Sequence, residues 1–156
     1  MTRGESSSEP IVREIRVAAP SDEVFRFFID PDKMILWHAR AAWMEPRRGG
    51  EFRIDVNGRN TASGEFVEID PPHRLVFTWG WEGSVELPPG SSRVEITFAD
   101  IGGGETLVRL VHSGIPDDMR DGNAVGWDHY LPRLQLAASG QPAGLDPWAN
   151  AKDLIP

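Results

Sequence analysis

Residues 116–140 read PDDMRDGNAVGWDHYLPRLQLAASG, and this stretch decides the fold. Four apolar residues recur at steps of four, three and four, the spacing of one helical face: Trp127, Leu131, Leu134 and Ala138. The pattern predicts a long amphipathic helix. Gly122 and Pro132 are poor helix formers and predict a break and a bend within it. Such a helix must be held by packing, with Trp127 as its anchor.

Upstream of this helix, apolar and polar residues alternate in short runs that are typical of half-buried β-strands. The predicted strands are residues 11–18, 51–56, 61–69, 75–81, 94–98 and 106–112. Asn57-Gly58 and the glycines at 102–104 indicate hairpin turns. Between 61 and 69 the apolar residues do not share one parity, which predicts a β-bulge.

Two short helices are predicted between the first two strands, at residues 22–29 and 32–37, and residues 38–50 are predicted as a connection. Consecutive strands with short turns favour an antiparallel sheet, and the long helix is the element able to cover its apolar face. The sequence therefore predicts an α+β fold, with a curved antiparallel sheet wrapped around a long C-terminal helix. We expect a flexible leader at 1–10, a single domain at 11–140 and a C-terminal tail at 141–156.

Composition narrows the class of protein. A chain of 156 residues buries enough surface for a core without disulfides, and it has no cysteine. Its formal net charge of -8 argues against nucleic acid as a partner. No apolar run suggests membrane insertion and the N-terminus is too polar for a signal peptide, so we expect a cytoplasmic protein. Six tryptophans are an excess of large aromatic side chains.

Several stretches resemble a known family. They are IVREIRVAAPSDEVFRFFIDPDKMILW at 11–37, GEFVEIDPPHRLVFTWGW at 64–81, LVRLVHSGIPDD at 107–118 and GWDHYLPRLQ at 126–135. Together they resemble the START-like, or SRPBCC, superfamily, and more narrowly the family named after the activator of Hsp90 ATPase (AHSA1-like). The resemblance implies a helix-grip fold with an apolar cavity between the sheet and the C-terminal helix.

The resemblance also bears on function. The wider superfamily binds apolar small molecules, which implies such a ligand here. The co-chaperone that names the family carries a further N-terminal domain that docks on the chaperone, and we expect no room for one in this chain. A chaperone partner is therefore an alternative that the sequence itself does not indicate.

The aromatic residues of several predicted elements are expected around one space. We predict a ligand-binding cavity lined by Trp37, Trp43, Phe52, Ile54, Phe66, Phe77, Trp79, Trp81, His112, Trp127, Tyr130, Leu131 and Leu134. Ligand sites are mostly apolar with a few polar groups, which fits this set. The alternative is a plain aromatic core.

Polar candidates are fewer. His112 ends a predicted inward strand face and is a candidate acid or base, as is Glu68; the alternative for His112 is a hydrogen-bonded core histidine. His38, next to Trp37 near the mouth, is predicted at the surface, with a functional role as the alternative, and His73 and His129 are predicted as structural or exposed. The histidine spacing indicates no metal site, no nucleophile motif is present and no cofactor is predicted.

These observations support binding of an apolar small molecule as the first hypothesis. The alternatives are an enzyme that uses the same cavity, of cyclase, dehydratase or hydrolase type, and a chaperone- or stress-related interaction module. Apolar residues of the tail, Trp148, Leu154 and Ile155, would allow docking on the body or formation of a homodimer.

Overall fold

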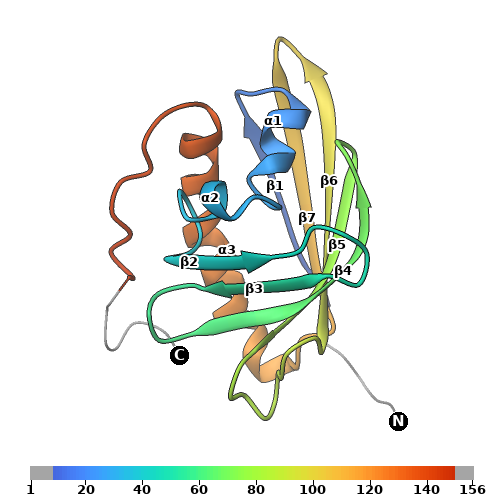
Figure 1. The fold of residues 1–156 in the computed structure, drawn as a ribbon, viewed down its shortest axis with the longest axis vertical. Helices are drawn as coiled ribbons and strands as arrows, with labels where there is room; N and C mark the ends of the chain where they lie inside the picture. Colours follow the sequence, from blue (N-terminus) through green and yellow to red (C-terminus); the bar gives the residue numbers. More distant parts are fainter. Residues whose placement is uncertain (1–8, 150–156) are drawn as a thin grey trace.

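The computed structural model describes residues 9–149 (Figure 1). Their elements, in chain order, are β1 (Ile11–Val17), α1 (Ser21–Arg26), α2 (Pro31–Met34), β2 (Ala41–Met44), β3 (Glu51–Asp55), β4 (Thr61–Asp70), β5 (Arg74–Trp81), β6 (Ser92–Gly102), β7 (Glu105–Ser113) and α3 (Asp117–Ala138). The strands form one antiparallel sheet in the order β1-β7-β6-β5-β4-β3-β2. The predicted α+β helix-grip fold is confirmed.

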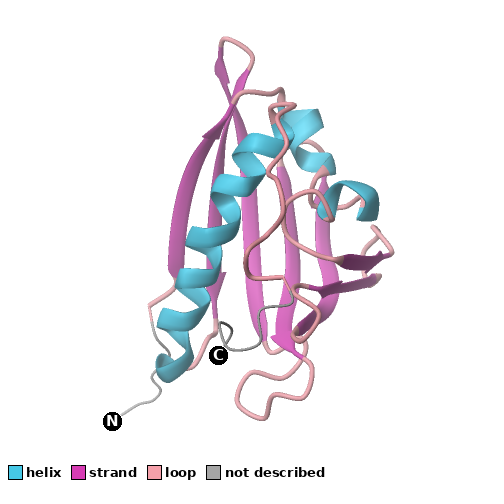
Figure 2. Cartoon of the chain, turned by 90° about the vertical axis from the view of Figure 1, so that its left-hand side faces the viewer, coloured by secondary structure: helices cyan, strands magenta, loops and turns pink. Residues whose placement is uncertain are grey.

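The sheet curves around α3, which crosses one of its faces (Figure 2). Each hairpin from β2 to β7 joins neighbouring strands, and β1 closes the far side by pairing with β7, Ile11 opposite His112 and Val17 opposite Thr106. The glycines at 102–104 form the β6–β7 turn with positive φ angles, the backbone region that glycine enters without steric cost.

The predicted β-bulge lies in β4. The register with β5 shifts between Phe66 and Glu68, so Phe66 turns into the core, opposite Phe77. Glu68 instead pairs with Arg74 at 3.1 Å, and its side chain is 44% exposed. The one extra residue therefore separates an aromatic core position from a surface carboxylate.

Helix α3 runs without interruption from Asp117 to Ala138, so the predicted break near Gly122 is wrong. All four residues of the predicted stripe are buried, together with Ala124 and Tyr130. Burying an aromatic or leucine side chain is worth roughly 1.5–3 kcal/mol, more than the roughly 1 kcal/mol that a glycine costs a helix. Packing thus outweighs intrinsic propensity.

Residues 38–50 contain a strand that the sequence prediction missed. β2 pairs with β3 at the edge of the sheet, Ala41 opposite Asp55 and Met44 opposite Phe52. Four residues are too few for alternation to be recognised. The two short helices exist but end earlier than predicted, and Pro20 occupies the N-cap of α1. Within residues 9–149, no helix is both long and apolar enough to cross a membrane.

Candidate functional site

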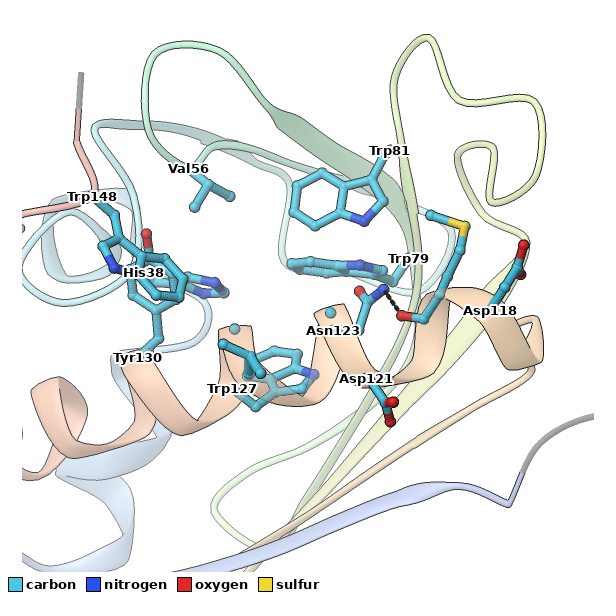
Figure 3. A pocket seen from close by; sticks show the side chains of 14 residues that line it. His38, Val56, Trp79, Trp81, Asp118, Asp121, Asn123, Trp127, Tyr130 and Trp148 are labelled. Carbon is cyan, nitrogen blue, oxygen red and sulfur yellow. Dashed lines mark hydrogen bonds between the residues drawn. The ribbon is translucent and has the colours of Figure 1, made fainter. Parts of the chain in front are cut away.

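A cavity of about 450 Å³ lies between the sheet and the N-terminal half of α3 (Figure 3). Residues of β5, of α3, of the segment after α2, of the β3–β4 turn and of the C-terminal segment line it: His38, Val56, Trp79, Trp81, Asp118, Met119, Asp121, Gly122, Asn123, Val125, Gly126, Trp127, Tyr130 and Trp148. Its volume falls in the range of small-molecule sites. Its walls are dominated by rings.

The rings meet one another in tilted and edge-on contacts. The centroids of Trp79 and Trp81 lie 5.3 Å apart with their planes at 79°, and those of Trp79 and Trp127 lie 5.5 Å apart at 43°. Alternation along β5 places Trp79 on the inner face, and the helical stripe places Trp127 opposite it. Tilted and edge-on pairs of this kind stabilise the packing of the wall beyond the area that they bury.

His112 lies behind this wall and is fully buried. The indole Nε1–H of Trp127 donates to Nδ1 of His112 at 3.0 Å, so the imidazole proton sits on Nε2. Nε2–H then donates to Ser92 Oγ at 2.9 Å, and the Ser92 hydroxyl donates to the carbonyl of Trp79 at 2.6 Å. Burial lowers the pKa of His112 to about 3, which keeps it neutral. Both ring nitrogens are committed, and the residue holds Trp127 in place.

The imidazole of His38 differs from that of His112 in its hydrogen bonding. It is 5% exposed and lies among four rings, with centroid distances of 4.7 Å to Trp37, 4.6 Å to Tyr130, 5.4 Å to Trp127 and 5.9 Å to Trp79. Burial lowers its pKa to about 3, so this imidazole is neutral too. Among residues 9–149 nothing is hydrogen-bonded to it. The prediction that His38 lies at the surface is wrong, because the chain after α2 turns inward instead of outward.

The segment after α3 folds back along the helix (Figure 1) and supplies part of the cavity wall. Asp146 accepts hydrogen bonds from His129 Nε2 at 2.7 Å and from the Tyr130 hydroxyl at 2.8 Å. Trp148 stacks on His129, with centroids 3.9 Å apart and planes at 6°. Arg133 donates to the carbonyls of residues 143 and 144. The predicted docking of Trp148 on the body is confirmed, whereas Leu154 and Ile155 lie outside the described residues.

These hydrogen bonds set the charges around the segment. Burial raises the pKa of Asp146, but the hydrogen bonds from Trp148 N–H, His129 and Tyr130 outweigh it and hold that pKa below its usual range. Burial, reinforced by the carboxylate of Asp146, raises the pKa of Tyr130. Tyr130 therefore stays a neutral phenol whose hydroxyl is already committed.

One fully buried polar atom of residues 9–149 lacks a partner. Nε1 of Trp79 is buried and is hydrogen-bonded to nothing in the described part of the chain. The charged residues that line the cavity are Asp118 and Asp121, both exposed on the first turns of α3. Residues 9–149 bring no group of three potential metal ligands together.

Four of the predicted ligand-binding residues line the cavity: Trp79, Trp81, Trp127 and Tyr130. The other predicted residues are not among those that line this cavity, and their contact with a ligand stays a prediction. Buried behind the wall or deeper in the core are Trp37, Phe52, Ile54, Phe66, Phe77, His112, Leu131 and Leu134. Phe52 and Phe77, for example, stack on each other at 4.2 Å and fill the space beneath Trp79.

Trp43 and Glu68 lie outside the site altogether. Trp43 is 44% exposed on edge strand β2, with the guanidinium of Arg53 over its ring at 4.6 Å. Glu68 is on the outer face beyond the bulge, so neither Glu68 nor His112 is placed to act as an acid or base in the cavity.

The residues that sequence reasoning missed come from two sources. Met119, Asn123 and Gly126 continue the helical stripe of Trp127 and Tyr130 toward the N-terminus by steps of four and three. The same helical spacing, continued toward the N-terminus, predicts these three residues on the face of Trp127. The break expected near Gly122 restricted the predicted stripe to residues 127–138. His38 and Trp148 lie in irregular segments and carry no periodic signal.

This curved antiparallel sheet around a long C-terminal helix is the helix-grip fold of START-like proteins. The chain belongs to the family described as activator of Hsp90 ATPase homolog 1-like protein, whose model matches residues 18–138. The suspected resemblance is therefore confirmed.

Curated relatives match the chain over part of their own length. The Hsp90 co-chaperone AHA1 of Saccharomyces cerevisiae is 26% identical over 136 residues, which are 83% of this chain and 37% of that protein. The chain spans about a third of the length of the curated relatives it matches.

Solved structures match over more of their length. An AHSA1-like protein from Rhizobium etli is 43% identical with a TM-score of 0.72, over 92% of this chain and 89% of that one. CalU16 from Micromonospora echinospora is 28% identical with a TM-score of 0.74, over 100% of this chain and 87% of that one.

Proposed function

We propose that this protein binds an apolar small molecule in the cavity between the sheet and α3. The observation that carries the proposal is the convergence of rings on one space. Trp79 and Trp81 from β5, Trp127 and Tyr130 from α3, and Trp148 from the C-terminal segment line a cavity of about 450 Å³. A plain aromatic core would be filled by these side chains, as it is around Phe52.

The hypothesis of an enzyme depended on His112 or Glu68 as an acid or base in the cavity. Both nitrogens of His112 are committed to Trp127 and Ser92, and Glu68 is on the opposite face of the sheet. Binding without chemistry is therefore the proposal that the geometry supports best.

Tryptophan fluorescence and thermal unfolding test the proposal together. A panel of apolar and aromatic compounds should contain members that change the emission, because four tryptophans line the cavity. A ligand at 100 times its Kd adds roughly 2.7 kcal/mol to the free energy of unfolding and should raise Tm by about 5–10 °C. Trp127→Ala should abolish both signals, whereas Trp43→Ala, outside the cavity, should keep them. If no compound in a broad panel moves either signal, the proposal is wrong.

A chaperone-related role is the second candidate, favoured by the similarity to the yeast Hsp90 co-chaperone over most of this chain. It predicts that the purified chain changes the ATPase rate of an Hsp90, and an unchanged rate at saturating concentrations would argue against it. Homodimer formation also stays a prediction, which sedimentation equilibrium tests.

A further inference from the structure

The chemistry of the cavity wall narrows the class of ligand, an inference that rests on the proposed function. The wall contains few aliphatic groups, chiefly those of Val56, Met119 and Val125. Six lining residues carry rings: His38, Trp79, Trp81, Trp127, Tyr130 and Trp148. Flat π-systems stack on or meet such rings edge-on, at a gain beyond that of buried area alone. The wall therefore favours an aromatic ligand over an alkyl chain.

His38 is the polar side chain left free in this wall. Its imidazole is 5% exposed, and nothing among residues 9–149 is hydrogen-bonded to it. The surrounding rings of Trp37, Tyr130 and Trp127 hold it in one orientation. Figure 3 shows it beside Tyr130 and Trp148, at one end of the group of lining side chains. The imidazole lines the open cavity, so a ligand that supplies a hydrogen-bond partner there gains the affinity of that bond.

His112 provides the contrast within the same cluster. It is equally buried, yet both of its nitrogens have side-chain partners. Side chains of this fold thus supply hydrogen-bond partners for the imidazole of His112, whereas none of residues 9–149 does so for the imidazole of His38.

Charge excludes an anionic ligand. Of the described residues that line the cavity, none is a lysine or arginine, and the charged ones are Asp118 and Asp121. Arg133 directs its three nitrogens to backbone carbonyls of residues 37, 143 and 144. A carboxylate buried here would lose its hydration without gaining a cation, which is strongly unfavourable.

We propose that the cavity takes an uncharged aromatic molecule that carries a hydroxyl group, and that His38 is the residue that selects this hydroxyl. A neutral imidazole offers one N–H donor and one bare nitrogen acceptor. In this proposal the bare nitrogen of His38 faces the cavity, where the hydroxyl of the ligand donates to it.

Three compounds with the same ring system test this inference by titration calorimetry at about pH 7.5. They are 2-naphthol, 2-methoxynaphthalene, whose oxygen cannot donate, and 2-naphthoate, which carries a negative charge. We expect 2-naphthol to bind about tenfold more tightly than the methyl ether, the effect of one hydrogen bond. We expect 2-naphthoate to bind at least about 100-fold more weakly than 2-naphthol.

His38→Phe keeps a ring among the surrounding rings and removes both nitrogens. It should bring the affinities of 2-naphthol and 2-methoxynaphthalene within about twofold of each other while 2-methoxynaphthalene still binds. His73→Phe makes the same change in the exposed β4–β5 turn and should leave all three affinities unaltered. Should His38→Phe fail to fold, ¹⁵N-histidine spectra of the natural chain give the same information. The ring nitrogens of His38 should shift with 2-naphthol and not with its methyl ether.

The possible outcomes separate this inference from the proposed function. Equal affinities for 2-naphthol and its methyl ether, tight binding of 2-naphthoate, or an unchanged preference in His38→Phe would each overturn the inference, although the cavity would still bind aromatic molecules. If none of the three compounds binds the natural chain, both the inference and the binding of aromatic ligands in this cavity are wrong.

Discussion

Acidification should weaken this fold through its two buried imidazoles. His38 and His112 both have a pKa of about 3 in the folded chain, against an ordinary value of 6.5. Burial is the principal cause for both; for His38 the charge of Asp146 raises the pKa, and those of His129 and Arg133 lower it. As the pH falls below 6.5, the unfolded chain binds a proton at each imidazole and the folded chain does not. The free energy of unfolding therefore decreases toward acid.

The magnitude follows from the two pKa values. Between about pH 7.5 and about pH 5, each buried imidazole lowers the free energy of unfolding by about 2 kcal/mol. The two together remove about 4 kcal/mol, a large share of the roughly 5–15 kcal/mol of a typical domain. Most carboxylates titrate below this window, so the imidazoles dominate it.

Urea unfolding followed by tryptophan emission at a series of pH values measures this effect. His38→Phe removes one of the two groups, so its loss over the same window should be about 2 kcal/mol instead of about 4. His73→Phe is the matched control and should lose as much as the natural chain, because the side chain of residue 73 is in water in both states. A free energy of unfolding that stays flat or rises toward acid would refute the reasoning, as would identical pH dependence in the natural chain and His38→Phe.

Four substitutions test individual contacts of the cavity wall and of edge strand β2. Trp127→Phe should destabilise the chain by about 1–3 kcal/mol more than Trp79→Phe in urea unfolding, because only the first leaves a buried acceptor, Nδ1 of His112, without its donor. Asp146→Asn should cost about 1–3 kcal/mol and speed amide exchange of residues 141–149, and exchange as slow as in the natural chain would contradict the role given to this carboxylate. Trp43→Ala should cost only about 0.5–1 kcal/mol, the value of an exposed cation–π contact, and a larger loss by urea unfolding would mean that Trp43 is packed.

Local residue patterns determined the scaffold. The steps of four and three from Trp127 to Ala138 fixed the buried face of α3, because side chains at these spacings share one side of a helix. Alternation likewise placed Trp79 on the inner face of β5, and the broken parity in β4 located the bulge. These features depend on neighbours in sequence, and they were predictable. The strand β2 was missed because its four residues are held by pairing with β3 and not by a pattern of their own.

The site depended on the tertiary structure. Sequence marked many aromatic residues as inward, but only the curvature and register of the sheet decide that Phe52 and Phe77 stack to fill the core while Trp79 borders a cavity. His38 lies in the segment after α2, and Trp148 lies in the segment after α3. Both segments turn toward the cavity, where His38 contacts Tyr130 and Trp148 stacks on His129. Periodicity carries no information about such contacts, so which aromatic residues enclose empty space, and which imidazole is left without a partner, was decided by the folded chain alone.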